Sequence, residues 1–543
     1  MRYRLLETVA EYAGERLDEA GDRGATERRH LMHYRELARL TDPELRGPRQ
    51  AFALARLEVE HDNIRGALRT AVRVGAEQEV LCVVHAMSWF WQLRNHHHDA
   101  RSWTRAAVGL GPDPFAAPVR AAEVFEGRCG DVPPPWAGER LREARRGGRL
   151  LALATEGGSG ATALERPETR ARLDAVIAAY RPGLPQVSRH PGTMWFFAQL
   201  MTGRYAGLDE TLAALVAAAR AHGDGWDLAY ALLLRAKLLG GQERDAEEAL
   251  ARFEEAGDSW GIAESLAARG ETYERAGRTA EAAEDFARAV DAVARLGARS
   301  QIPVFRALLA AVRLRTPEVA EDPAAREVAE RMLVEAAAES GESGVEAVST
   351  ARLLLAQHYG NTGRTGPARE QLDHIQREFN DITPGLFQGM LDGLGGWLDC
   401  VDGRYADAEA RLAGAVREME ALAYLVAPYL VVTQFATAAW ALAGCGAAEE
   451  GARLLGAYDT HRGTPGGAGL RPLTATTEAS VRAHAERALR AALAAEVFAA
   501  RYAQGATLTV REAAQRVREP ARRAARDVPG PPPGPPESAR RPG

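Results

Sequence analysis

The sequence contains almost no lysine. Of its 68 basic residues one is a lysine, Lys237, and all the others are arginine. A phosphate-binding P-loop needs the order Gly-Lys-Ser or Gly-Lys-Thr, because the lysine ammonium contacts the β- and γ-phosphates. Lys237 stands between an alanine and a leucine, so the sequence has no P-loop and predicts no bound nucleotide. The glycine-rich stretch at 155–163 lacks lysine as well, and we interpret it as a linker.

Cysteine is scarce and dispersed, and long apolar runs are missing. The four cysteines, which form no Cys-x-x-Cys pair, are Cys82, Cys129, Cys400 and Cys445. Disulfide scaffolds are dense in cysteine and zinc sites use close pairs, so we expect reduced, mostly buried thiols. No apolar run approaches the roughly 20 residues that span a bilayer, and the N-terminus lacks the pattern of a signal peptide. These absences favour a cytoplasmic protein.

Isoleucine is also rare, with six residues in a chain of 543. Ala, Leu, Arg and Glu run throughout, and this combination favours helix over strand. The length exceeds what one hydrophobic core supports, so we expect several domains or a repeat array. A net charge of −6 argues against a chain-wide nucleic-acid surface, because such a surface needs a basic excess. The composition therefore predicts an all-α protein.

One stretch, residues 262–296, fits the tetratricopeptide pattern of two antiparallel helices. In this pattern small residues let the two helices approach closely, and aromatic residues fill the space between them and the next unit. Leu266 and Arg269 depart from the Trp and Leu of the pattern, and its closing Pro is absent. The small and aromatic positions that match are Gly270, Tyr273, Ala282, Phe286 and Ala289.

The turn of this unit recurs along the chain. Gly-Arg turns are centred on Gly203, Gly277, Gly363 and Gly403. We expect a weaker unit at 302–340, further turns at 240–249 and 444–452, and a hairpin at 87–108 with Asn95 at its turn. Trp91 and Ala100 in that hairpin align with Tyr273 and Ala282. Together these signals predict about eight helical hairpins, which form a tetratricopeptide-like superhelix, or α-solenoid.

Proline and glycine divide the chain into parts. Residues 111–192 carry both in positions that helices avoid, so we expect irregular loops with short helices there, including one at 170–180. The last residues are rich in Pro and Gly and almost free of apolar side chains, which predicts a disordered tail. The expected parts are a helical segment at 1–75, a first hairpin at 76–110, the irregular region at 111–192, the repeats at 193–500, and a helix end with the tail at 501–543.

Three quoted stretches carry a resemblance to a known family. "RYRLLETVAEYAGERLDEAG" near the N-terminus and "LARLEVEHDNIRGALRTAV" at 54–72 resemble a segment of large actinobacterial regulators. These are the signal-transduction ATPases allied to the Streptomyces antibiotic regulatory proteins and to LuxR-type transcriptional regulators. The stretch "ARLLGAYDTHR…RAALAAEVFAARYAQGATLTVREAAQRV" at 452–517 resembles the C-terminal end of the same family.

In that family a DNA-binding or effector domain precedes an NB-ARC nucleotide switch and a winged helix, and a tetratricopeptide superhelix follows. The resemblance implies that this chain corresponds to the sensor and scaffold half, without the NB-ARC ATPase and DNA-binding domains. We therefore expect protein partners, such as a separately encoded ATPase or a second copy, and no direct binding of DNA, membrane or nucleotide. The alternatives are a stand-alone adaptor and, less favoured, an enzyme with an unrecognised site. An NB-ARC frame directly upstream of Met1 would favour the first hypothesis over the adaptor.

Two stretches of the first hairpin contain residues with binding chemistry. "NHHHDA" at 95–100 offers three histidines and an acid, but adjacent histidines on a helix point about 100° apart and cannot all reach one ion. We interpret it as a solvated turn rather than a metal site. "MSWFWQL" at 87–93 is interpreted as core between hairpins, with an aromatic ligand box as the alternative.

Two further stretches are weighed in the same way. The basic stretch at 511–526 is interpreted as a solvated helix end, with nucleic-acid contact as the alternative. In "HDNIRGAL" at 61–68, helix capping and ion pairs explain His61, Asp62 and Arg65. No G-x-S-x-G or H-E-x-x-H motif is present. We therefore predict no catalytic, cofactor-binding or metal-binding residues, and a protein that is not an enzyme.

The first helix of the sequence has no element before it to cover its apolar face. The stripe on residues 2–17 consists of Tyr3, Leu6, Val9, Ala10, Ala13 and Leu17. In one hypothesis residues 1–20 form a docking face, because an exposed apolar stripe usually marks an interaction surface. In the other, the helix folds back onto residues 26–40, whose own stripe passes through Leu31, Tyr34 and Leu37.

Overall fold

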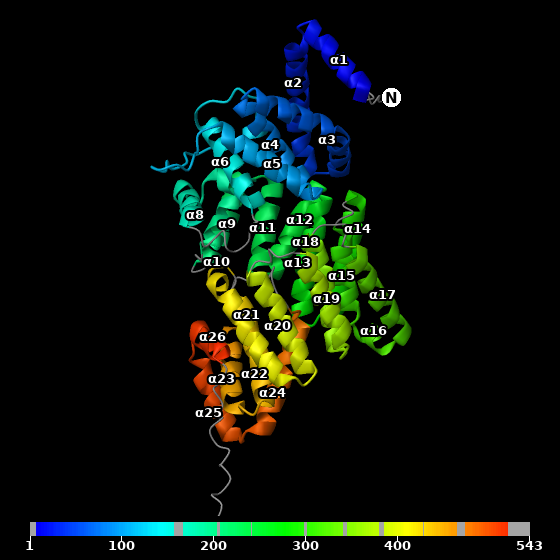
Figure 1. Cartoon of the computed structure of the whole chain (residues 1–543), viewed down its shortest axis with the longest axis vertical. Helices are drawn as coiled ribbons and strands as arrows, with labels where there is room; N and C mark the ends of the chain where they lie inside the picture. Colours follow the sequence, from blue (N-terminus) through cyan, green and yellow to red (C-terminus); the bar gives the residue numbers. More distant parts are fainter. Residues whose placement is uncertain are drawn as a thin grey trace, which may run out of the picture.

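The chain folds into an all-α superhelix of helical repeats, as shown by a computed structural model (Figure 1). The structure describes residues 7–156, 167–202, 207–240, 242–297, 301–339, 345–378, 385–426, 428–463 and 473–519. No strand occurs in these ranges, which confirms the fold class predicted from composition and turn spacing. Within the same ranges no helix is long and apolar enough to cross a membrane.

The N-terminal unit comprises the helices that precede the regular repeats. It lies at one end of the molecule in Figure 1, and its helix α1 projects away from the body. In chain order its elements are α1 (Glu7–Glu19), α2 (Arg23–Thr41), η1 (Asp42–Arg46), α3 (Gln50–Arg73), α4 (Glu77–Leu93), α5 (His97–Leu110), η2 (Cys129–Asp131), α6 (Gly138–Glu156), α8 (Pro167–Ala179), η4 (Pro185–Ser188) and α9 (Met194–Met201).

Helix α1 does not cover residues 26–40. Its side chains Val9 and Tyr12 are 44% and 59% exposed. Leu31 and Leu37 of α2 are instead buried in a hydrophobic core that the N-terminal unit shares with the first repeats, and no α1 residue with described burial belongs to this core. The fold-back hypothesis is therefore wrong for the described part of the helix. Of the stripe residues, Val9 is exposed, and Ala13 and Leu17 are half-buried outside the core. Tyr3 and Leu6 lie outside the described residues.

Helix α6 is the main departure from the sequence prediction, which expected irregular structure with only short helices at 111–192. Its 19 residues include Gly147 and Gly148, the residues taken as helix breakers. A Cβ on Gly147 would lie 2.3 Å from the His85 ring of α4, and one on Gly148 would lie 2.8 Å from Leu81. The glycines therefore allow α6 to pack closely on α4, and this packing offsets their low helix propensity. The predicted helix at 170–180 is present as α8, and the predicted linker at 155–163 lies mostly outside the described residues.

The regular repeats follow as pairs of antiparallel helices, in the middle of Figure 1. The turn residues Gly277, Gly363 and Gly403 have φ angles of 77°, 74° and 74°, a left-handed conformation that favours glycine. Asn95 takes the same role in the first hairpin with φ at 56°. The helices of this part are α10 (Leu208–His222), α11 (Gly225–Leu239), α12 (Glu243–Ala256), α13 (Ser259–Arg275), α14 (Thr279–Leu296), α15 (Ile302–Arg313), α16 (Pro317–Glu321), α17 (Pro323–Glu339), α18 (Val345–Asn361) and α19 (Thr365–Glu378).

The hairpin of α13 and α14 packs as its residue types predict. Phe286 is fully buried, and a Cβ on Gly270 would lie 3.0 Å from its ring. Arg269, which departs from the pattern, donates from Nε and Nη2 to the two oxygens of the Asp285 carboxylate, each at 2.7 Å. The charged pair thus joins the two helices where the pattern has an apolar contact.

The C-terminal part has its own hydrophobic core at the opposite end of the molecule. Within the predicted part at 501–543, one helix (Ala495–Ala506) ends and a second, shorter helix (Val510–Arg518) follows. Residues 520–543 lie outside the described part. The helices are α20 (Gly385–Val401), α21 (Tyr405–Val426), α22 (Pro428–Gly444), α23 (Ala448–His461), α24 (Ala475–Ala492), α25 (Ala495–Ala506) and α26 (Val510–Arg518).

The four cysteines form no disulfide, as predicted. Cys82, Cys129 and Cys400 are buried, and Cys445 is half-buried. Burial raises the pKa of the Cys82 thiol to about 12, so this group stays protonated at neutral pH. Because the thiolate is the reactive form, the buried Cys82 is a structural residue.

Candidate ligand-binding site

Two cavities flank helix α4, where the N-terminal unit meets the repeats. The larger one, which we call the apolar cavity, has a volume of about 410 Å³. Its walls come from α4, α5, α6, α8 and α9 on the N-terminal side and from Tyr230 of α11 on the repeat side. Leu151, Phe197 and Met201 supply apolar surface, and Ser88 and His190 supply polar atoms. A volume and composition of this kind fit a small, mostly apolar ligand.

The aromatic run at 87–93 forms both core and cavity wall. Trp89 and Phe90 have no exposed surface. The Trp89 ring packs edge-on against Trp226 and Trp260 of the repeats, with ring centroids 5.3 and 4.8 Å apart. This packing confirms the interpretation of the run as core between hairpins. Trp91 is 1% exposed and also lines the apolar cavity, together with Ser88 and Gln92, so three residues of the run face a cavity that could accept a ligand.

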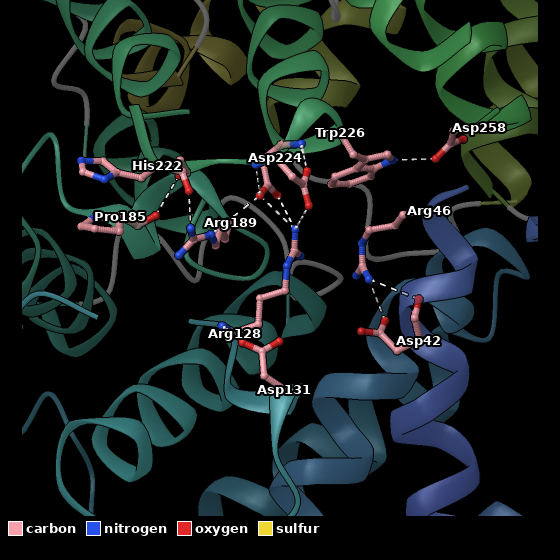
Figure 2. A network of polar contacts seen from close by, with 12 residues as sticks. Asp42, Arg46, Arg128, Asp131, Pro185, Arg189, His222, Asp224, Trp226 and Asp258 are labelled. Carbon is pink, nitrogen blue, oxygen red and sulfur yellow. Dashed lines mark hydrogen bonds and ion pairs between the residues drawn. The ribbon is translucent and has the colours of Figure 1, made fainter. Parts of the chain in front are cut away.

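The second cavity, which we call the arginine cavity, has a volume of about 270 Å³. Its lining includes Arg39, Arg46, Arg128 and Arg189. Figure 2 shows the polar network beside it. Arg128 donates to the Asp224 carboxylate at 3.1 Å and to both oxygens of Asp227 at 2.8 and 2.9 Å. The arginines are thus held by acidic partners, and the cavity presents positioned guanidinium groups rather than a strong net positive charge.

Arg128 connects two distant parts of the chain. It lies in the loop before η2, whereas Asp224 and Asp227 form the capping box at the start of α11. Asp227 is 1% exposed. Burial raises the pKa of the Asp227 carboxyl, and the Arg128 guanidinium opposes this effect. An ion pair shielded from water in this way is costly to break, because either partner alone would remain as an uncompensated buried charge.

A second buried contact joins α3 to the repeats. The Asp258 carboxylate caps α13 by accepting from the Gly261 N–H at 2.8 Å. It also accepts from Gln50 of α3 at 3.0 Å. A third donor is the Trp226 indole N–H, at 2.6 Å (Figure 2). The Arg46 guanidinium lies over the Trp226 ring at 5.3 Å and donates to Asp42 at 2.9 Å. Arg46, which lines the arginine cavity, therefore contacts Trp226 of the first regular repeats.

His190 lines both cavities. Burial and the nearby Arg46 guanidinium lower the pKa of His190 well below its ordinary value, so its ring is neutral. Ser88 Oγ donates to the carbonyl of His85 at 2.9 Å and lies 3.3 Å from His190 Nε2, in a hydrogen bond whose donor depends on the tautomer of the ring. The Nδ1 atom of His190 is buried and has no hydrogen-bond partner among the described residues.

The Ser88–His190 contact lacks part of the arrangement of a catalytic triad. No described acidic group orients His190 Nδ1, as the third member of a triad would. Ser88 Oγ also has the His85 carbonyl as an acceptor at 2.9 Å. Both side chains line the apolar cavity and offer it hydrogen-bonding groups.

The structure brings together residues from two stretches that the sequence analysis weighed separately. His61 of α3 lies beside His96 and Asp99, with one ligand atom of each within 4.8 Å of the others. His97 and His98 are exposed, as expected for a solvated turn. Asp62 is 85% exposed and pairs with Arg65 at 3.7 Å, which agrees with the predicted ion pair on the helix.

The basic stretch at 511–526 is bound to acidic and aromatic neighbours where it is described. Arg516 donates to Glu450 at 2.7 Å, and Arg518 pairs with Glu420 at 2.5 Å. The Arg511 guanidinium lies over the Tyr424 ring at 4.8 Å. These contacts support the interpretation as a helix end over the interpretation as a nucleic-acid surface.

Sequence reasoning missed Arg128, Arg189 and His190. All three lie in the region that was interpreted as irregular on account of its proline and glycine. The sequence did contain a signal for a binding site, namely arginine and histidine residues inside proline-rich loops. Loops held on a rigid scaffold commonly carry binding residues.

Comparisons with known proteins connect the chain to transcription regulation. No protein-family model matches it. A segment of 102 residues is 34% identical to proteins of Mycobacterium bovis and of two Mycobacterium tuberculosis strains. These proteins are provisionally named HTH-type transcriptional regulators. The match covers 19% of this chain and 11% of each relative. The chain is thus similar in part to transcription regulators, over a small share of their length.

Proposed function

We propose that this chain is a regulatory sensor and scaffold module of a transcription regulator in the cytoplasm. It binds a small, mostly apolar effector in the apolar cavity and contacts protein partners through its helical repeats. It carries no ATPase or other catalytic activity. The partial similarity to transcription regulators and the helical-repeat fold support the regulatory role. The proposal has two further parts. The helical repeats are of the tetratricopeptide type, and the chain acts together with a signalling ATPase that carries an NB-ARC switch.

One observation carries the sensor part of the proposal: the apolar cavity lies at the joint between the N-terminal unit and the repeats. Tyr230 contributes to its wall from α11, and Trp91 contributes from α4. A ligand that fills the cavity therefore contacts both sides of the joint. Its binding energy can favour one arrangement of the two parts over another, which is the requirement for a ligand-controlled switch.

The binding step is tested with a fluorescent apolar probe, 1-N-phenylnaphthylamine. Wild-type protein should bind it saturably with one site. Ala198→Leu should weaken binding at least tenfold, because Ala198 is buried in the cavity wall and the added methyl groups occupy its volume. Ala499→Leu, on the exposed face of α25, is the matched control and should bind as the wild type does. Met201→Ala enlarges the cavity and should retain binding, which separates a blocked cavity from a damaged fold.

The regulatory step is tested in the strain that carries the gene. Deletion should change the abundance of a defined set of transcripts, and wild-type protein should restore it. The Ala198→Leu variant should fail to restore the set, whereas Ala499→Leu should succeed. An unchanged transcript profile after deletion would contradict the role in transcription, even if the cavity binds the probe.

A further inference from the structure

The cluster of His61, His96 and Asp99 has donor chemistry that the proposed function does not use. His61 comes from the middle of α3, and the other two residues flank the start of α5. The side chains of His61 and Asp99 are 11% and 12% exposed, and that of His96 is 29% exposed. The cluster is therefore a largely enclosed contact between two helices that are remote in the sequence.

The distances place acceptor atoms against each other. His61 Nε2 is 3.3 Å from Asp99 Oδ2. The same Nε2 atom accepts a hydrogen bond from the Trp91 indole N–H at 3.3 Å. Since an indole nitrogen only donates, Nε2 carries no proton in this arrangement, and its lone pair faces a carboxylate oxygen. A cation between the two atoms would convert this repulsion into attraction.

His96 supplies a third donor atom. Its ring lies beside that of His61, with centroids 4.4 Å apart. Its Nε2 is buried without a hydrogen bond among the described residues and is 3.6 Å from the Glu58 carboxylate. Rotation of this ring toward the other ligand atoms breaks no hydrogen bond of Nε2.

We propose that His61, His96 and Asp99 bind a divalent transition-metal ion of the zinc class. Imidazole nitrogens select such ions over Mg²⁺ and Ca²⁺, which prefer oxygen ligands. Ligands at 2.0–2.1 Å from a tetrahedral zinc ion are about 3.3 Å apart, the separation observed between His61 and Asp99. The remaining coordination positions are filled by water.

The second oxygen of Asp99 has a role in this site. Asp99 Oδ1 is 3.5 Å from Arg65 Nε, while Oδ2 faces His61. A ligating carboxylate is commonly oriented by a second contact of this kind. The metal replaces the Trp91 N–H as the partner of His61 Nε2. The ion would fix α3 to the start of α5, next to Arg94, which donates to the carbonyl of Gly297 at the end of α14.

The test uses full-length protein without a polyhistidine tag, freed of metal by a chelator. Titration with Zn²⁺ should show one site per chain, and Co²⁺ should give the visible absorption bands of a site with nitrogen ligands. His96→Gln should weaken binding at least tenfold, and its partial exposure makes this variant the one best tolerated by the fold. His61→Gln should have the same effect.

The adjacent histidines supply the matched control. A double variant with His97→Gln and His98→Gln removes two exposed imidazoles from the same turn and should bind Zn²⁺ as tightly as wild type. Far-UV circular dichroism in the presence of chelator verifies that each variant is folded. Unchanged Zn²⁺ binding in His96→Gln would overturn the proposal. So would loss of binding in the double variant, because the metal would then be held by surface histidines. The outcome is independent of whether the apolar cavity binds an effector.

Discussion

Replacing Asp258 by alanine tests whether buried polar contacts hold the N-terminal unit to the repeats. Asp258 has no exposed surface and accepts hydrogen bonds from three donors. One is the Gly261 N–H in the first turn of α13, and the others are the side chains of Gln50 and Trp226. Alanine removes the helix cap and leaves the Trp226 indole N–H without its partner. Gln50 keeps its second bond, to the carbonyl of Leu45 at 2.8 Å.

The magnitude follows from these losses. A lost N-cap costs about 1 kcal/mol, and a buried donor left without a partner costs about 1–3 kcal/mol. Burial raises the pKa of the Asp258 carboxyl, so part of the hydrogen-bond energy is offset by the desolvation of its charge. We expect Asp258→Ala to lower the free energy of opening at the joint by about 3 kcal/mol. Thr509→Ala removes only an exposed cap, at the start of α26, and should cost about 1 kcal/mol.

Hydrogen exchange measured by mass spectrometry suits this protein, because repeat arrays do not unfold in a single step. Asp258→Ala should speed exchange in α13 and also in α3, which is far away in the sequence but shares the contact through Gln50. Thr509→Ala should affect α26 alone. Equal effects of the two variants, or unchanged exchange in α3, would refute the idea that Asp258 joins the two parts.

Further changes have defined outcomes. Phe286→Ala should cost about 3–5 kcal/mol, and hydrogen exchange should rise in α13 to α15 before more distant helices, because each hairpin contacts its neighbours; uniform loosening would contradict the repeat assignment. The Arg364 guanidinium lowers the pKa of Glu330 to about 2 from 4.5. This interaction stabilises the fold above pH 4.5 and is lost as pH falls toward 2, so the stability difference between wild type and Arg364→Met, measured by denaturant unfolding, should shrink over that interval. Deletion of residues 1–20 should leave the thermal unfolding temperature unchanged, because α1 adds no buried residue to the core; a drop of several degrees would show that α1 does stabilise the core. Isothermal titration should detect no saturable ATP binding, since no P-loop is present.

The parts of the fold that the sequence predicts are those with local causes. The turn at Gly277 is predictable because a left-handed residue after a helix favours glycine whatever surrounds it. The core position of Phe286 follows from the spacing within one hairpin. Helix α6 was missed because Gly147 and Gly148 serve a contact with α4, more than 50 residues earlier in the chain. From the local sequence, these glycines are expected to break a helix. Their presence inside α6 is explained only by the close packing of α6 on α4.

The candidate sites depend more than the fold does on contacts between residues that are far apart in the sequence. Arg128 and Asp227 are 99 residues apart, and neither stands in a motif. His61 and Asp99 each belong to a stretch that the sequence analysis examined, but their contact depends on how α3 packs against α5. The expectation that three adjacent histidines cannot share one ion agrees with the structure, which turns His96 inward and leaves His97 and His98 exposed. What sequence could not supply was the partner residue on another helix.

The polar contacts at the joint determine how a ligand in the apolar cavity can act. A buried carboxylate loses its hydrogen-bond donors when it moves, and this loss is costly in the low-dielectric interior. The pairs Arg128–Asp227 and Gln50–Asp258 both cross from the N-terminal unit to the repeats, close to α4 and its cavities. On the proposed function, we therefore expect a change in α4 to move the helices that these pairs connect. It follows that removing either pair should leave effector affinity nearly intact and weaken its effect on the repeats.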